Sequence, residues 1–130
     1  MNGPNGEQRT VLVVDDEDDV RTIAAQIVRM LDFWVIEANG AEAALKILRG
    51  PIKVDLLFTD ITMPGLSGLE LAHLAKQLRP DLKVLYTSAH FLGGADNPAL
   101  QYGPLIAKPW MFAQLREVID TLMETDKRAS

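Results

Sequence analysis

Three carboxylates, one hydroxyl and one ammonium group stand directly after short apolar runs of the sequence. The carboxylates belong to Asp15, Asp16 and Asp60, the hydroxyl to Ser88 and the ammonium group to Lys108. Carboxylates that meet repel one another, so such a cluster either raises at least one pKa or binds a cation. Ligands that are all oxygen favour a hard ion, and Mg²⁺ prefers one or two carboxylates with water and phosphate oxygens. The residue types therefore indicate a magnesium site.

Asp60 is the candidate nucleophile of this group. Beside a bound metal ion its carboxylate could attack a phosphoryl group and form an acyl phosphate. This transfer depends mostly on positioning and charge neutralisation, which Mg²⁺ and Lys108 would supply, and Ser88 could donate a hydrogen bond to a phosphoryl oxygen. Taken singly, an aspartate at a strand end usually caps a turn or a helix. The combination of the five groups is what favours phosphoryl transfer.

The apolar runs before these residues predict strands. Continuous apolar runs, rather than strict alternation, are typical of strands buried on both faces of a parallel sheet. Four runs are clear and one, at 34–38, is weaker. The clear runs cover residues 11–14, 56–59, 83–87 and 104–107.

Between the runs, apolar residues recur with the period of a helix, which predicts four amphipathic helices. Their apolar stripes contain Val20, Ile23, Ala24, Ile27 and Leu31; Ala41, Ala44, Leu45 and Leu48; Leu71, Leu74, Ala75 and Leu78; and Phe112, Leu115, Ile119 and Leu122. The alternation predicts an α/β fold, a doubly wound parallel sheet with helices on both faces and right-handed crossovers. Residues just beyond the carboxyl ends of such strands face one crevice, which would bring the five groups together.

The segment from His90 to Gly103 departs from the helical pattern. It contains three glycines, an asparagine and a proline, so any helix there is predicted to be short or irregular. We expect a single domain over residues 9–124. The polar ends, residues 1–8 and 125–130, are expected to be disordered tails.

The composition excludes several classes of protein. Of the 130 residues, 48% are hydrophobic and 24% are charged, which is ordinary for one globular domain. Cysteine is missing, so the chain has no disulfide and no thiolate metal site. A net charge of -5 argues against a nucleic-acid surface, and no apolar run approaches the roughly 18 residues that a membrane span needs. We expect a cytoplasmic protein that binds neither nucleic acid nor membrane.

Four parts of the sequence resemble the motifs of response regulator receiver domains of two-component systems. Val13-Val14-Asp15-Asp16-Glu17 is similar to their acidic motif, and residues 55–65, followed by Gly68-Leu69-Glu70-Leu71, resemble the segment around their phosphoacceptor. Residues 84–89 resemble the segment with the switch Ser or Thr, and Lys108-Pro109-Trp110 is similar to their Lys-Pro-Phe motif. The resemblance extends over residues 9–124.

The resemblance implies a fold and a metal site. The fold would be the flavodoxin-like receiver fold, a five-stranded parallel sheet in the order 2-1-3-4-5. Asp60 would be the phosphoacceptor. Asp15, Asp16, Asp60 and the backbone carbonyl of Thr62 would hold Mg²⁺, with Asp16 the more direct ligand of the first two.

The resemblance also implies how the site works. Ser88 and Lys108 would contact the phosphoryl group, and the peptide bond before Pro109 would be cis, which is uncommon. A histidine kinase or a phosphotransfer protein would donate the phosphoryl group. The protein would not be an enzyme in the usual sense, because it would catalyse only its own phosphorylation and dephosphorylation.

Some positions depart from the family pattern. Leu105 stands where receivers usually carry a Tyr or Phe whose ring changes rotamer on phosphorylation, so an aromatic flip there cannot report the change. His90, and also Thr62, could tune hydrolysis of the acyl phosphate, although a solvated loop residue is the favoured interpretation of His90. Trp110 and Phe112 are expected to pack against the sheet.

Other functions remain as alternatives. A phosphatase of the haloacid dehalogenase type needs an acid two residues after its nucleophile, where this sequence has Thr62, and an FMN carrier needs a phosphate cradle that Asp15 and Asp16 would oppose. A receiver-like scaffold that is never phosphorylated is the main alternative. With no room for an output domain, the chain would bind a downstream protein target, pass the phosphoryl group along a relay, or act as a phosphate sink.

Overall fold

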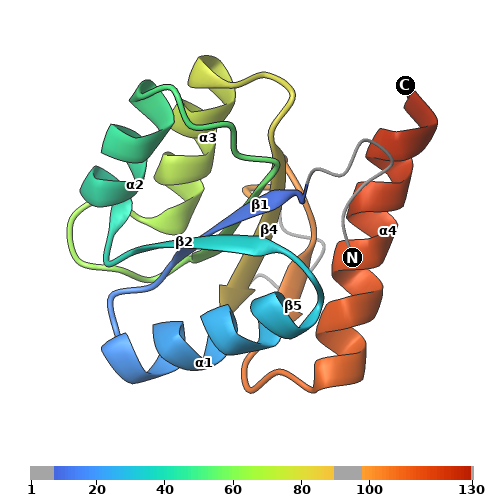
Figure 1. The fold of residues 1–130 in the computed structure, drawn as a ribbon. Helices are drawn as coiled ribbons and strands as arrows, with labels where there is room; N and C mark the ends of the chain where they lie inside the picture. Colours follow the sequence, from blue (N-terminus) through green and yellow to red (C-terminus); the bar gives the residue numbers. More distant parts are fainter. Residues whose placement is uncertain (1–7, 90–97, 130) are drawn as a thin grey trace.

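Strands and helices alternate along the chain, as the sequence predicts (Figure 1). The computed structural model describes residues 8–89 and 98–129. The strands are β1 (Thr10–Val14), β2 (Trp34–Ala38), β3 (Leu56–Asp60), β4 (Lys83–Ser88) and β5 (Leu105–Ala107). The helices are α1 (Asp18–Met30), α2 (Ala41–Arg49), α3 (Gly68–Leu78) and α4 (Phe112–Ala129). Every predicted strand is present, within one residue of its predicted bounds.

The five strands form one parallel sheet in the order β2-β1-β3-β4-β5. This result confirms the predicted fold class and strand order. Every residue of the central strand β3 is buried, and so are the last four residues of β1. Residues 11–14 of β1 and 56–58 of β3 are all apolar, because helices cover both faces of these strands.

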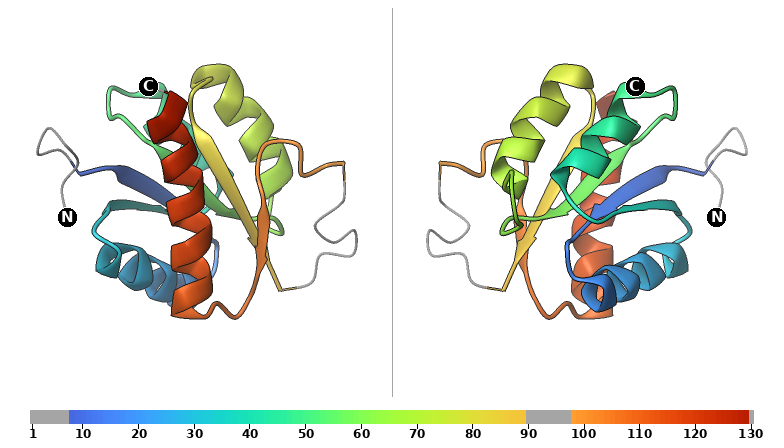
Figure 2. Two further views of the ribbon diagram at one scale, coloured as in Figure 1. Left: turned by 90° about the vertical axis from the view of Figure 1, so that its right-hand side faces the viewer. Right: turned by 90° about the vertical axis from the view of Figure 1, so that its left-hand side faces the viewer.

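Two apolar cores lie on opposite faces of the sheet, and Figure 2 shows the sheet between the two pairs of helices. On one face, α2 and α3 contribute Ala41, Ala44, Leu45, Leu48, Leu71, Ala72 and Ala75. On the other face, α1 and α4 contribute Ala24, Val28, Leu115, Ile119 and Met123. Small residues predominate on α1, α2 and α3, so these helices can lie close to the strands.

Three members of the predicted stripes are more exposed than their pattern suggested. Ile23 is 51% exposed, Leu78 41% and Phe112 39%. The buried face of α1 is centred on Ala24, Ala25 and Val28, which leaves Ile23 at its border. Leu78 and Phe112 are the last residue of α3 and the first of α4, where a helix has few neighbours.

The predicted domain boundaries need one correction. Helix α4 continues to Ala129, past the boundary that we had placed at residue 124. No glycine or proline interrupts residues 112–129, so the polar sequence is still able to continue the helix. Residues 1–7 of the other predicted tail lie outside the described residues, while Gln8 bonds through its side chain to the carbonyl of Asp32. In the described chain, no helix is both long and apolar enough to cross a membrane.

The connection between β4 and β5 forms turns, without a helix, in its described part at residues 98–104. Residues 90–97 lie outside the described residues. The predicted short or irregular helix falls largely on them, as does His90.

Gly68 begins α3 in close contact with the end of β3. A Cβ atom at this position would lie 2.1 Å from the Asp60 carbonyl oxygen, and the Gly68 N–H donates to the Ile61 carbonyl at 2.8 Å. Next to it, Ser67 and Glu70 form a reciprocal capping box that fixes the start of the helix. The loop after Asp60 is therefore held against the backbone of α3, at a place where no side chain fits.

Gly68→Ala should lower the free energy of unfolding by about 1–3 kcal/mol, because either the Asp60 carbonyl or the start of α3 must move. Urea unfolding followed by circular dichroism measures this change. Gly50→Ala is the matched control: its Cβ would meet only an ordinary contact at 3.4 Å, and the residue is extended. Equal losses in the two variants would contradict the close-contact explanation.

Candidate functional site

The side chains singled out in the sequence lie at the carboxyl edge of the sheet. Asp15 directly follows β1, Asp60 and Ser88 end β3 and β4, and Lys108 directly follows β5. Asp15, Asp60 and Ser88 are 2%, 5% and 4% exposed, whereas Asp16 is exposed to solvent. The parallel order of the strands is what brings residues so far apart in sequence to one edge.

Lys108 joins two of the carboxylates. Its Nζ atom lies 2.9 Å from Asp15 Oδ2 and 3.3 Å from Asp60 Oδ2. The side chains of Lys108, Asp15 and Asp60 are 13%, 3% and 7% exposed, so water screens these ion pairs far less than it screens a surface pair. One ammonium group thus holds two buried carboxylates together.

The acidic cluster suits a divalent cation. Asp15, Asp16 and Asp60 offer carboxylate oxygens that all lie within 4.8 Å of one another. Lys108 balances only one of their three charges. Both oxygens of Asp15 already accept hydrogen bonds, from Glu17 N at 3.0 Å and from Lys108, while no bond within the described chain engages the Asp16 carboxylate. An all-oxygen donor set that still carries negative charge and has one exposed member fits a hydrated ion such as Mg²⁺.

Burial changes the ionisation of Asp60 and Lys108. Burial raises the pKa of the Asp60 carboxyl above its ordinary value of 3.8, and the charge of Asp15 adds to this rise. Lys108 and the Thr62 backbone N–H oppose the rise without cancelling it. For Lys108, burial alone would lower the pKa of the ammonium group, but Asp15 and Asp60 together raise it above 10.5. Lys108 is therefore charged at neutral pH, while the surroundings of Asp60 disfavour the charged form of its carboxyl group.

The remaining predicted residues lie around this centre. The Lys108–Pro109 peptide bond is cis. The backbone N–H of Lys108 donates to the Ser88 carbonyl at 3.1 Å, which joins the lysine segment to the end of β4. Thr62 is exposed in the loop after β3. Leu105 is half-buried at the start of β5.

Leu105 lies directly opposite Tyr86 in the β4–β5 register. Tyr86 is fully buried, and within the described chain its hydroxyl has no hydrogen-bond partner. Burial raises the pKa of this hydroxyl to about 12, although the nearby Tyr102 backbone slightly opposes the rise. The aromatic ring that the family places on β5 is thus missing, and a buried ring stands beside that position on β4.

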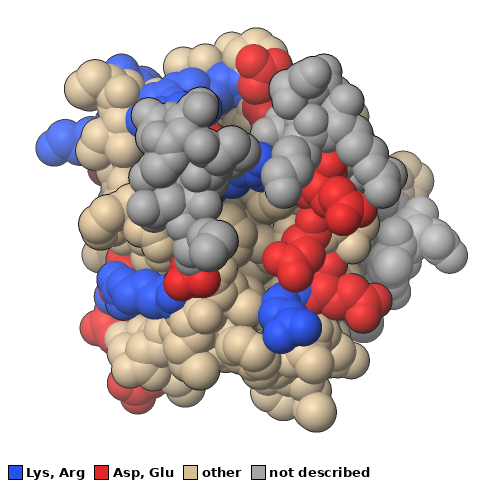
Figure 3. All heavy atoms as spheres, turned by 45° about the vertical axis from the view of Figure 1, so that its right-hand side comes forward, with Lys and Arg blue, Asp and Glu red and all other residues tan. Residues whose placement is uncertain are grey.

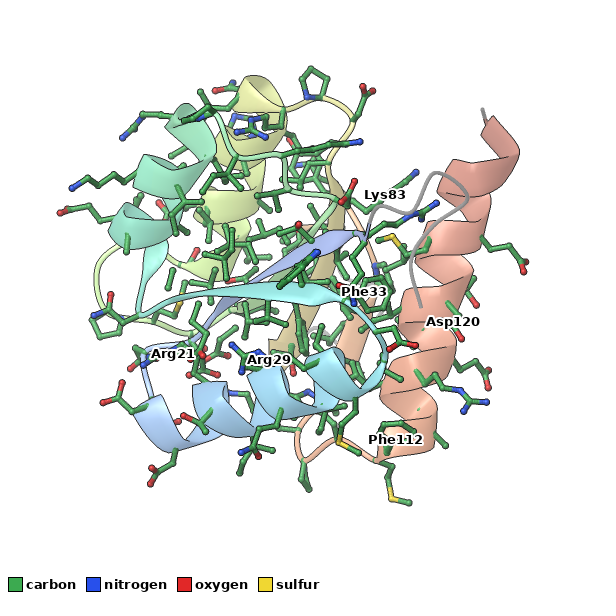
Figure 4. The ribbon with its side chains drawn as sticks, in the orientation of Figure 1. Arg21, Arg29, Phe33, Lys83, Phe112 and Asp120 are labelled. Atoms are coloured by element: carbon green, nitrogen blue, oxygen red, sulfur yellow. The ribbon has the colours of Figure 1, made fainter. Side chains whose placement is uncertain are left out.

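The sequence did not reveal the hydrogen bonds through which three further residues hold the site. Arg21 of α1 donates to the Asp15 carbonyl at 2.9 Å and pairs with Asp18 and Glu37, and Figure 4 shows Arg21 and Arg29 pointing from α1 toward β2. Trp110 donates from its indole to the Thr87 hydroxyl at 2.8 Å. The one feature of the sequence that could have pointed to this bond is adjacency: Trp110 follows the Lys-Pro pair, and Thr87 precedes Ser88. Their side-chain directions depend on the sheet and not on spacing.

Asp60→Asn should raise the free energy of unfolding of the metal-free protein by about 0.5–2 kcal/mol at a pH above the native pKa of Asp60, a typical gain for a stabilising substitution. Between pH 3.8 and the higher native pKa, native Asp60 keeps a proton that the unfolded chain has released. Raising the pH through this window therefore destabilises the native protein. The advantage of the asparagine variant should be absent below this window and full above it. Urea unfolding with a chelator, over a pH series, measures it, and an advantage that grows toward acid pH would contradict this account.

Tyr86→Phe should raise the free energy of unfolding by about 1 kcal/mol, because it removes a buried hydroxyl without a partner and keeps the ring. Thermal unfolding measures the change. Tyr102→Phe is the control, since the Tyr102 hydroxyl bonds to His73 Nδ1 at 2.8 Å and its removal should bring no gain. A loss of stability in Tyr86→Phe would mean that the hydroxyl is satisfied.

Comparison with known sequences places this arrangement in one family. The profile of the response regulator receiver domain matches residues 11–120. Chemotaxis protein CheY of Listeria monocytogenes is 35% identical over 114 residues, which are 85% of this chain and 94% of CheY. The response regulator receiver protein CpdR of Brucella abortus is 29% identical over 88% of this chain and 97% of its own length. By contrast, the chain spans 24% of the transcriptional regulator NtrC of Azospirillum brasilense.

Solved structures agree with the sequence comparison. A receiver domain protein from Clostridium thermocellum has the same fold, with a TM-score of 0.83 at 24% identity over 94% of this chain and 99% of its own. The response regulator TrrA of Thermotoga maritima, in complex with Mg²⁺ and BeF, has a TM-score of 0.79 at 29% identity over 88% and 99% of the two chains. The family match includes every residue of the acidic edge and Lys108. This chain therefore belongs to the response regulator receiver domain family and is a receiver domain of a two-component signalling system.

Proposed function

We propose that Asp60 accepts a phosphoryl group from a histidine kinase or a phosphotransfer protein. The observation that carries this proposal is the contact of Lys108 Nζ with both Asp15 and Asp60 inside a cluster of three carboxylates. Phosphoryl transfer requires a cation and a nucleophilic carboxylate held in contact, beside carboxylates that could hold a metal ion, and this sheet edge supplies them.

Asp60 and Lys108 act on the same group. An Asp60 carboxylate oxygen forms a bond to phosphorus while the bond from phosphorus to the donor atom breaks, which leaves an acyl phosphate. Lys108 is fully charged and already in contact with Asp60, so it can pair with the negative charge of the phosphoryl oxygens at little cost in reorganisation. Ser88, buried at the end of β4, donates a hydrogen bond from its hydroxyl to a phosphoryl oxygen.

Asp15, Asp16, Asp60 and the backbone carbonyl of Thr62 would hold Mg²⁺. When bound, the ion neutralises negative charge on the carboxylates and on the phosphoryl oxygens. Asp16 is the exposed member and Asp15 the one already bonded to Glu17 and Lys108, so Asp16 meets the hydrated ion more directly.

The protein acts as a signalling receiver and not as an enzyme with a separate substrate. It promotes only its own phosphorylation and the hydrolysis that reverses it, which Thr62 and His90 are placed in the sequence to tune. The signal leaves through contact with a downstream protein or through transfer of the phosphoryl group. Acidic side chains extend along α4 in Figure 3, with Glu117, Asp120 and Glu124 exposed, so this face is unsuited to nucleic acid.

A receiver-like binding scaffold is the second candidate, and Leu105 is the observation that favours it. Without an aromatic ring on β5, the family's usual rotamer change cannot occur at this position. A scaffold would bind its partner equally well whether or not Asp60 can be modified. The retained Lys108 contact with Asp60 favours the phosphorylated form of the proposal.

Incubation with acetyl phosphate and Mg²⁺ should add one phosphoryl group, acid-stable and base-labile, at Asp60. Asp60→Asn should take up none, and Asp81→Asn, an exposed aspartate between α3 and β4, should be labelled as fully as the wild type. Lys108→Ala should slow labelling by roughly 10²-fold, the loss typical of one charge-stabilising donor, while Mg²⁺ affinity changes little. Mass spectrometry and metal titration measure both effects. Labelling of Asp60→Asn at the wild-type level would refute the assignment.

A further inference from the structure

Trp110 bridges the three segments that carry the site. Its indole Nε1 donates to the Thr87 hydroxyl oxygen at 2.8 Å, and its ring lies against Phe58 with the ring centroids 5.5 Å apart and the planes at 59°. This ring arrangement is favourable for an aromatic pair. Trp110 is half-buried on the face of the sheet that α1 and α4 cover.

Each contact of Trp110 lies one or two residues from a site residue. Thr87 precedes Ser88 and is paired with Asp60 in the β3–β4 register, and Phe58 precedes Asp60 by two residues on β3. Thr87 and Phe58 are 3% and 1% exposed, so both are fixed parts of the sheet. Trp110 itself follows Lys108 by two residues. The indole therefore connects the lysine segment to the strands of the phosphoacceptor and of the hydroxyl.

We propose that Trp110 is a positioning residue for Lys108, acting through its hydrogen bond to Thr87. This inference rests on the proposed function, for which the place of Lys108 Nζ between Asp15 and Asp60 is essential. The lysine side chain has a flexible four-carbon stem, so its backbone must be held if the ammonium group is to stay in one place. Only Pro109 separates Trp110 from Lys108, and its ring fixes φ. Holding Trp110 in place therefore restricts where the Lys108 backbone can lie.

The bond to Thr87 supplements one backbone contact. The Lys108 N–H bonds to the Ser88 carbonyl at 3.1 Å, and on the adjacent strand pair the Ile61 N–H bonds to the Thr87 carbonyl at 2.9 Å. The first of these ties Lys108 to β4, and the second ties the loop after Asp60 to β4. Beyond the end of β5, the Lys108 N–H is the other described bond between this segment and β4, and packing against Phe58 would not by itself fix the rotation of the Trp110 ring.

The test compares Thr87→Val with Trp110→Phe, which remove the acceptor and the donor and keep the shape of the strand and the ring on Phe58. Each should lower the rate of labelling at saturating acetyl phosphate by roughly tenfold to a hundredfold, since a misplacement of ~1 Å can cost about 10²-fold. The Mg²⁺ concentration for half-maximal labelling should change less than about twofold, which is well below the expected loss of labelling rate. The double variant should be no slower than either single variant. Thr87→Ser, which keeps the hydroxyl, should restore the rate.

Trp34→Phe is the matched control, because Trp34 is the other tryptophan of the chain and is 61% exposed on β2. It should label at the wild-type rate. Additive losses in the double variant, an unchanged rate in Thr87→Val, or equal slowing in Trp34→Phe would each overturn the proposal. A loss of thermal stability in Thr87→Val without slower labelling would reduce Trp110 to a packing residue.

A second measurement keeps this proposal separate from the proposed function. In carbon-13 NMR at fixed neutral pH without metal, the Asp60 carboxyl signal should move in Thr87→Val and Trp110→Phe, because Lys108 leaves its place, and should stay in Trp34→Phe. If the wild type takes no label at all, the proposed function fails, yet a shifted Asp60 signal still supports positioning by Trp110. An unmoved Asp60 signal in both variants contradicts it whatever the labelling result.

Discussion

One ammonium group in contact with two buried carboxylates is the interaction on which the rest of the structure depends. Removing the ammonium group would leave two buried carboxylates without a counter-charge, and an uncompensated buried charge typically costs about 3–5 kcal/mol. Lys108, Asp15 and Asp60 come from the ends of β5, β1 and β3, so the contact exists only if these strands end at one edge. The parallel sheet and its crossovers are the means by which the chain satisfies this constraint.

The constraint also explains features that look unrelated to the charges. Gly68 allows α3 to begin against the Asp60 carbonyl, so the strand can end where the carboxylate is needed. Arg21 holds the Asp15 carbonyl from the side of α1. Trp110 holds the lysine segment from the face that α1 and α4 cover. Each of these residues fixes the backbone beside one member of the charged group.

The sequence was sufficient for the fold and for the residues at the edge, for a physical reason. Continuous apolar runs mark buried parallel strands, and polar residues at their ends must then share one edge, so Asp15, Asp60, Ser88 and Lys108 followed from position alone. The Thr87–Trp110 bond did not follow, and neither did the Tyr86 hydroxyl, which has no partner among the described residues. Both depend on which face of β4 each side chain takes and on what lies opposite it, and only the register supplies this. The end of α4 was missed because polar composition says little about helix length.

Strand β4 is the element through which the proposed modification of Asp60 would affect side chains on both faces of the sheet. Successive side chains alternate between the faces, so Thr87 meets Trp110 on one face while Tyr86 lies in the opposite core. The proposed phosphoryl group would add roughly 1.5–2 negative charges and would compete with Asp15 for Lys108. A response of Ser88 at the end of β4 would then act on both faces. Among the described residues the Tyr86 hydroxyl has no hydrogen-bond partner, a cost that a rearranged β4 could relieve. With leucine at position 105, β4 and not β5 offers the aromatic ring for such a change.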